Sequence, residues 1–134
     1  FTVGGCKVLR STGADKACIV AAGITVHEAL DAHRRLQEQG VSVAVIDLYS
    51  IKPLDAATLI KVSAAAGNRV ITVEDHYPEG GLGEAVASAL ANSGVRIQSL
   101  AVRQLSRSGS PEELMAAAGI DAASIVATVL HPKT

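Results

Sequence analysis

Three short apolar runs restrict the fold of this chain more than any other feature. They are Ala17–Ala22 (ACIVAA), Val41–Ile46 (VSVAVI) and Arg69–Val73 (RVITV). Each run has the length of a strand and lacks the regular polar alternation of a strand with one solvated face. Continuous apolar strands are typical of parallel sheets that carry helices on both faces. We therefore expect all three segments to lie inside such a sheet.

Helical patterns occupy the intervals between these runs. Thr25 and Glu28 have the spacing of a capping box, and the helix that they begin is expected to stop at Gly40. Asp55 is the predicted N-cap of a second helix, which ends at the pair Gly67-Asn68. The order of elements is therefore strand, helix, strand, helix, strand.

The second half of the chain continues this alternation. A third helix carries residues 82–90, and Arg96–Val102 is a further strand. The sequence Ser110-Pro111-Glu112-Glu113 combines an N-cap, a first-turn proline and a capping-box glutamate, so it predicts a short helix. Asp121 is the predicted N-cap of the last helix.

Near the start of the chain, Lys7–Arg10 is a predicted strand. The residues before the next strand are too few for a parallel crossover, so the two strands would pair antiparallel if they are neighbours. The whole pattern predicts a three-layer α/β/α sandwich around a mostly parallel five-stranded sheet, with one antiparallel strand at an edge. The 134 residues have the length of a single domain, 1–134, in which residues 1–6 form an interdomain lead-in segment.

Composition argues against several classes of partner. The formal net charge is −1, so the chain lacks the basic excess with which proteins bind nucleic acids or anionic membranes. Aromatic residues make up 2% of the chain, too few for base-stacking surfaces. No apolar stretch reaches the roughly 18 residues of a membrane span. Cys6 and Cys18 have no metal-ligand spacing, and we expect a reduced, buried Cys18 and a cytoplasmic location.

Ligands of an open parallel sheet bind where loops follow the carboxyl ends of the strands. The charged residues that these loops would bring to one edge are Asp47, Lys52, Glu74, Asp75, His76, Arg103 and Arg107. The cluster Glu74-Asp75-His76 would be an acid–base or metal site, or it would face solvent or a neighbouring domain. We favour the second interpretation because a metal site needs ligands that converge from other loops.

A glycine-rich turn, Gly80-Gly81-Leu82-Gly83, precedes the third helix. It is no Walker phosphate loop, and Val86 replaces the third glycine of a dinucleotide fingerprint. Backbone amides at that helix start can hold an anion, although a tight turn that needs glycine is the simpler interpretation. The candidate anion or interface edge therefore comprises Glu74, Asp75, His76, Gly80, Gly81, Gly83, Arg103 and Arg107.

The stretch Val70–Val86 (VITVEDHYPEGGLGEAV) resembles the corresponding segment of transketolases, in particular those of animals. Further landmarks agree in the same order: Phe1–Val8 (FTVGGCKV), Gly23–Leu30 (GITVHEAL), Ile51–Asp55 (IKPLD), Arg107–Gly109 (RSG) and Leu114–Ile120 (LMAAAGI). Each landmark is weak alone, but the ordered series covers nearly the whole chain. The resemblance is to the C-terminal third domain of that family only.

Transketolases transfer two-carbon ketol units between sugar phosphates, with thiamine diphosphate and a divalent cation (Mg²⁺ or Ca²⁺), at a site between their other two domains. The Gly-Asp-Gly motif and the asparagine pair that hold this cofactor and its metal do not occur in this sequence. The resemblance thus implies no catalytic, cofactor-binding or metal-ligating residue here, and no cofactor bound by this chain. It implies a non-catalytic domain, inactive in isolation, that packs on the middle transketolase domain and supports a homodimer.

Two other functions stay open at this point. A stand-alone or regulatory module would bind an anion or phosphometabolite at the glycine-rich turn, beside Arg103 and Arg107. Alternatively, the chain would be the equivalent domain of a related thiamine enzyme, a 2-oxoacid dehydrogenase β subunit or deoxyxylulose-phosphate synthase. The residues Glu74–Tyr77 (EDHY) favour transketolase. Because the sequence begins at Phe1, without methionine, we expect a piece of a longer polypeptide.

Overall fold

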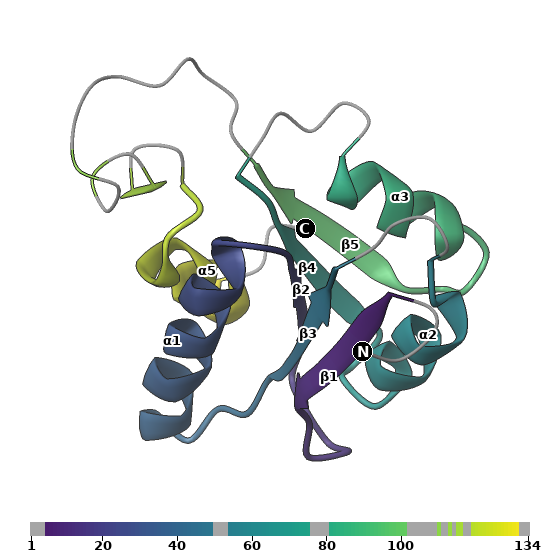
Figure 1. Ribbon diagram of the computed structural model, residues 1–134. Helices are drawn as coiled ribbons and strands as arrows, with labels where there is room; N and C mark the ends of the chain where they lie inside the picture. Colours follow the sequence, from purple (N-terminus) through teal and green to yellow (C-terminus); the bar gives the residue numbers. More distant parts are fainter. Residues whose placement is uncertain are drawn as a thin grey trace.

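The computed structural model describes residues 5–49, 54–75, 81–101, 110, 113, 115–116 and 119–131. In this part of the chain, five strands form one sheet in the order β1-β3-β2-β4-β5 (Figure 1). The strands are β1 Cys6–Arg10, β2 Cys18–Ala21, β3 Ala44–Leu48, β4 Arg69–Val73 and β5 Arg96–Leu100. The helices that lie wholly within the described residues are α1 Thr25–Glu38, α2 Ala56–Ala64, α3 Leu82–Ala89 and α5 Ala122–Leu130.

The sheet is parallel except at one edge. Strands β3, β2, β4 and β5 pair in parallel, whereas β1 pairs antiparallel with β3, with Lys7 opposite Asp47. The predicted antiparallel edge strand is confirmed. Its partner is not the next strand of the sequence, because the crossover through α1 places β3 between β1 and β2.

Alternate residues of the central strands point into two separate apolar layers. On one face, Ile19 and Ile71 pack with Leu36 of α1 and Val129 of α5. On the other face, the core contains the intervening strand residues together with side chains of α2 and α3. Figure 1 shows the same division, with α1 and α5 on one side of the sheet and α2 and α3 on the other. The predicted α/β/α sandwich is therefore confirmed, and its central strands are buried on both faces.

A buried arginine ties the last helix to the sheet. The Arg69 guanidinium, at the start of β4, donates from Nη1 to the Val129 carbonyl at 2.9 Å and from Nη2 to the Thr128 carbonyl. These carbonyls belong to the last turn of α5, where backbone acceptors lack partners within the helix and a cation is favourable. Burial lowers the pKa of Arg69, and the nearby charge of Arg96 adds to this effect.

The predicted capping box at the start of α1 is wrong. The N-cap is Ile24, which has no side chain to accept a hydrogen bond, and Thr25 is buried. The Thr25 hydroxyl lies instead 2.8 Å from the carbonyl oxygens of Ala22 and Val73. Glu28 accepts a hydrogen bond from the Ala122 amide of α5 at 3.0 Å. Both side chains thus bond to buried or helix-terminal backbone groups of other elements, which need partners more than the start of α1 does.

The other predicted caps are confirmed. Asp55 accepts from the Thr58 amide at 3.1 Å and Asp121 from the Ser124 amide at 3.0 Å. Ser110 and Glu113 bond to each other's backbone amides, as a capping box requires.

The strand boundaries differ most from those predicted at β3 and β5. β3 spans Ala44–Leu48 instead of starting at Val41, because the Val41 amide caps the C-terminal end of α1: it donates to the Leu36 carbonyl. β5 ends at Leu100, and Val102 lies outside the described residues. No helix in the described segments has the length and apolarity to span a bilayer.

Candidate functional site

The strand order identifies the crevice in which this type of sheet binds ligands. β2 leads through α1 to β3 on one side, whereas β4 leads through α3 to β5 on the other. The chain therefore diverges between the carboxyl ends of β2 and β4, and such a switch point is the usual ligand crevice of an open α/β sheet. The first residues of α1 and α3 follow these strand ends, so both helix N-termini belong to the crevice.

A buried carboxylate occupies the start of α3. Glu74 follows β4 directly and is 1% exposed. Its Oε1 accepts from the Leu82 amide at 2.9 Å, and its Oε2 accepts from the Gly83 amide at 2.8 Å. The first amides of a helix have no acceptor within the helix and lie at the positive end of its dipole. The N-cap residue Gly81 offers no side chain, so Glu74 performs this capping from the preceding strand end.

Gly83 allows the helix to approach this carboxylate closely. A Cβ atom at Gly83 would lie 2.7 Å from Ser99 Oγ, 2.9 Å from Glu74 Oε2 and 3.2 Å from Thr72 Oγ1. The two hydroxyls are themselves joined, since Thr72 Oγ1 donates to Ser99 Oγ at 3.0 Å. The space beside the α3 N-terminus is thus filled by polar side chains of β4, β5 and the residue after β4.

Thr25 closes the opposite wall of the crevice. It begins α1 and is fully buried, and its hydroxyl lies 2.8 Å from the last carbonyl of β4, that of Val73. The same oxygen accepts from the Ala22 amide at 3.1 Å. This side chain therefore bonds the end of β2 to the end of β4 across the switch point.

The residues of the predicted anion or interface edge have different positions. Glu74, Gly81 and Gly83 are buried, and Asp75 is exposed. Of the other predicted residues, those outside the described part of the chain are Lys52, His76, Gly80, Arg103 and Arg107. The role of this edge in binding an anion or a neighbouring domain stays a prediction. The structure adds that the Leu82 and Gly83 amides already hold a carboxylate of the chain itself.

Asp47 lies near the crevice at the end of β3. It is half-buried, and burial raises the pKa of its carboxyl, while the charge of Lys7 on the neighbouring strand opposes this shift. Across the described ranges, no group of three or more His, Cys, Asp or Glu side chains has the geometry to hold a metal ion.

The two cysteines are buried and unpaired with each other. No disulfide joins Cys6 and Cys18, and Cys18 is a buried thiol, as expected from its apolar surroundings. Burial raises the pKa of Cys18 to about 12, and it also raises the pKa of Cys6. The Cys6 thiol donates to Asp55 Oδ2 at 3.6 Å, so it connects the start of β1 to the start of α2. Neither thiol has the lowered pKa of a reactive cysteine.

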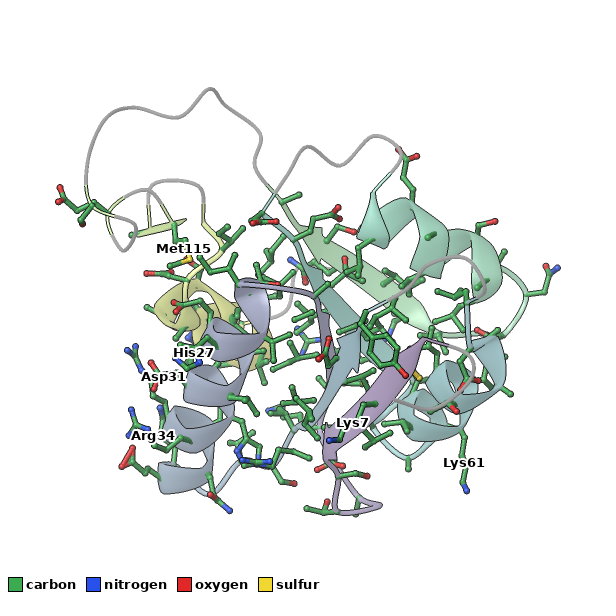
Figure 2. The ribbon with its side chains drawn as sticks, viewed as in Figure 1. Lys7, His27, Asp31, Arg34, Lys61 and Met115 are labelled. Atoms are coloured by element: carbon green, nitrogen blue, oxygen red, sulfur yellow. The ribbon has the colours of Figure 1, made fainter. Side chains whose placement is uncertain are left out.

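A hollow lies along α1. It has a volume of about 450 Å³ and is lined by His27, Glu28, Leu30, Asp31 and Arg34. Figure 2 shows His27, Asp31 and Arg34 in a row along this helix. Asp31 pairs with Arg34 at 2.7 Å and with Arg35 at 3.0 Å, and the Arg34 hydrogen bond is the main cause that lowers the pKa of Asp31.

Two features of the crevice escape prediction from the sequence. The contact of Thr25 with Val73 joins residues 48 positions apart, and local capping rules indicate a different partner. The sequence indicates Gly83 as one glycine of a tight turn, whereas its close approach to Ser99 depends on the neighbouring strand β5. The sequence gives a partial indication of the contact between Glu74 and the helix start eight and nine residues later. It places an acidic residue between a buried strand and a glycine-rich helix start.

Comparison with known proteins places this geometry in a family. Residues 4–125 match the sequence model of "Transketolase, C-terminal domain". The mouse transketolase-like protein 2 is 48% identical over 130 residues, which are 96% of this chain and 21% of that protein. Mouse transketolase is 44% identical over 130 residues, again 96% of this chain and 21% of that protein. The chain thus spans about a fifth of the length of the curated relatives it matches.

Solved structures agree with this fold. A split-gene transketolase, described as an inactive β4 tetramer, superposes with a TM-score of 0.86 at 34% identity, over 97% of this chain and 42% of that chain. Transketolase from Campylobacter jejuni gives a TM-score of 0.68 at 18% identity, over 95% of this chain and 18% of that chain. The matches favour transketolase over a stand-alone module and over the related thiamine enzymes.

Proposed function

The chain belongs to the transketolase C-terminal domain family, and from this premise we propose that it is the third domain of a transketolase. The whole enzyme would transfer two-carbon ketol units between sugar phosphates. This chain, 1–134 with residues 1–6 as its lead-in, would be a single supporting domain of that enzyme and no catalyst by itself.

The observation that carries the supporting role is the closed switch-point crevice. Thr25 bonds one strand end to the other, and Glu74 takes the amides at the start of α3. A ligand in this position would need exactly the donors and the space that these side chains use. The domain would therefore contribute packing surface to the enzyme instead of a binding site for substrate.

The described residues of this chain do not fit the cofactor of the family. A metal-anchored diphosphate needs several oxygen or nitrogen ligands that converge on one ion. No such cluster lies in the described part of the chain, and the sequence contains neither Gly-Asp-Gly nor an asparagine pair. We therefore assign thiamine diphosphate and its divalent cation to other domains of the enzyme.

The proposed partners are those other domains and a second copy of the enzyme. Packing on the middle domain and support of a homodimer would follow from the place of this domain in the family. The split-gene relative, in which a solved tetramer of one chain type is inactive, supports the separation of structural and catalytic parts. A cytoplasmic location fits two buried, reduced thiols, which a reducing compartment preserves.

Calorimetric titration of the 134-residue chain with thiamine diphosphate and Mg²⁺ tests this proposal. We expect no heat of binding, and no ketol transfer between sugar phosphates when the chain is assayed alone with both additives. Saturable binding in the micromolar range, or transfer above the rate without protein, would refute the supporting role.

A further inference from the structure

The start of α3 has the donors of an anion site but already contains an anion. In α/β proteins that bind phosphates, free amides at a helix N-terminus coordinate the ligand. Here the Leu82 and Gly83 amides each donate to one oxygen of the same Glu74 carboxylate, at 2.9 and 2.8 Å. We infer that Glu74 is an internal anion that locks the ligand crevice of this domain shut. This inference concerns the chain itself and does not depend on the proposed function.

Because Glu74 is buried, its contact with the start of α3 differs from a helix cap at the surface. Glu74 is 1% exposed, and a carboxylate removed from water is costly unless hydrogen bonds and favourable charges compensate it. Both of its oxygens have an amide donor, and the dipole of α3 adds a favourable field. An external anion would have to expel the carboxylate and repeat both bonds. It would make no hydrogen bond to these two amides that Glu74 does not already make.

Among the described residues, the space between Gly83 and Glu74 is already filled by side chains. The position that a Cβ of Gly83 would take already lies 2.9 Å from Glu74 Oε2 and 2.7 Å from Ser99 Oγ. On the other side of the switch point, Thr25 Oγ1 contacts the Val73 carbonyl. The lock therefore has two parts: a carboxylate that takes the donors and a hydroxyl that joins the strand ends.

Glu74→Gln tests the lock without a change in side-chain size. The glutamine keeps one acceptor oxygen but turns an NH₂ group toward the second amide donor, so one hydrogen bond is lost. Glu84→Gln is the matched control, because Glu84 lies in the first turn of the same helix but is exposed. Amide hydrogen exchange, measured by NMR on the 134-residue chain, reports directly on the Leu82 and Gly83 amides.

We expect Glu74→Gln to reduce the exchange protection of these two amides by about tenfold or more, which corresponds to the loss of a hydrogen bond to a charged group. Glu84→Gln should leave their protection close to that of the unchanged chain. Equal protection in the unchanged chain and in Glu74→Gln would overturn the lock. A saturable shift of the Leu82 and Gly83 signals by millimolar inorganic phosphate in the unchanged chain would overturn it as well.

Glu74→Ala supplies a second test, because it vacates the position of the carboxylate. Sodium formate should then stabilise this variant against thermal unfolding beyond the effect of sodium chloride at equal ionic strength. At ten times its dissociation constant, formate should raise the folded-to-unfolded ratio about 11-fold. The unchanged chain and Glu84→Gln should respond to the two salts alike. If Glu74→Ala also responds alike, the inference fails, and if this variant does not fold, the exchange measurement decides.

Discussion

Gly83→Ala is the substitution whose effect follows most directly from the structure. The new methyl group would lie 2.7 Å from Ser99 Oγ, 2.9 Å from Glu74 Oε2 and 3.2 Å from Thr72 Oγ1. Overpacking of this kind costs about 1–3 kcal/mol. Alanine recovers about 0.5–1 kcal/mol because it favours the helix more than glycine does. The middle of these ranges gives an expected net loss of about 1–2 kcal/mol in the free energy of unfolding.

Urea unfolding followed by circular dichroism measures this loss. With a slope of about 2 kcal/mol per M, the midpoint should fall by roughly 0.5–1 M. Ser88→Ala is the matched control, because it places alanine at an exposed position of the same helix, and it should not lower the midpoint. Adding Ser99→Ala to Gly83→Ala removes the nearest atom of the clash, so the double variant should lose less than the sum of the single losses. A midpoint for Gly83→Ala equal to or above that of the unchanged chain would refute the packing argument.

Three further predictions concern the supports of the fold. Arg69→Met should destabilise the chain by about 2–3 kcal/mol in urea unfolding, since it leaves the last carbonyls of α5 without their charged donor. Asp55→Ala should lower the free energy of unfolding by about 1 kcal/mol at pH 7, because it removes the N-cap of α2. Because the Thr58 hydroxyl lowers the pKa of Asp55 in the folded chain, this contribution is present above the unfolded pKa of about 3.9 and is lost as the pH falls through the folded value. The difference in the free energy of unfolding between Asp55→Ala and the unchanged chain should thus shrink as the pH falls from about 5 to about 3. Cys6 and Cys18 should resist a thiol-specific disulfide reagent at about pH 8 and react on addition of guanidinium, because burial raises the pKa of both thiols.

The architecture of the chain is predictable from local sequence because its central strands, β2, β3 and β4, have no solvated face. Val70 and Ile71 point to opposite sides of the sheet, and both are fully buried. Their apolar run therefore indicates a central strand without any knowledge of its neighbours. The caps Asp55 and Asp121 are equally local, because each acts on an amide three residues later.

The partners in the crevice are not predictable in this way. Thr25 and Glu28 satisfy the capping-box pattern, yet each bonds to an element distant in sequence. The local sequence shows which hydrogen bonds a helix start can make. Which bonds form depends on burial, because buried backbone groups cannot bond to water instead. Water can satisfy the exposed start of α1, but it does not reach the Val73 carbonyl at the buried end of β4, so the Thr25 hydroxyl is drawn there.

The same reasoning explains why an acidic residue after a buried strand does not by itself indicate an active site. Glu74 follows β4 at the position where this class of fold places its chemistry, which makes it a natural candidate for acid–base or metal function. Its two oxygens, however, accept from two amides that would otherwise be buried without partners. A carboxylate whose two oxygens hold these amides cannot bind a ligand through the same oxygens without opening the helix start. The cost of that opening, which the loss of exchange protection in Glu74→Gln measures, therefore separates a structural carboxylate from a catalytic one.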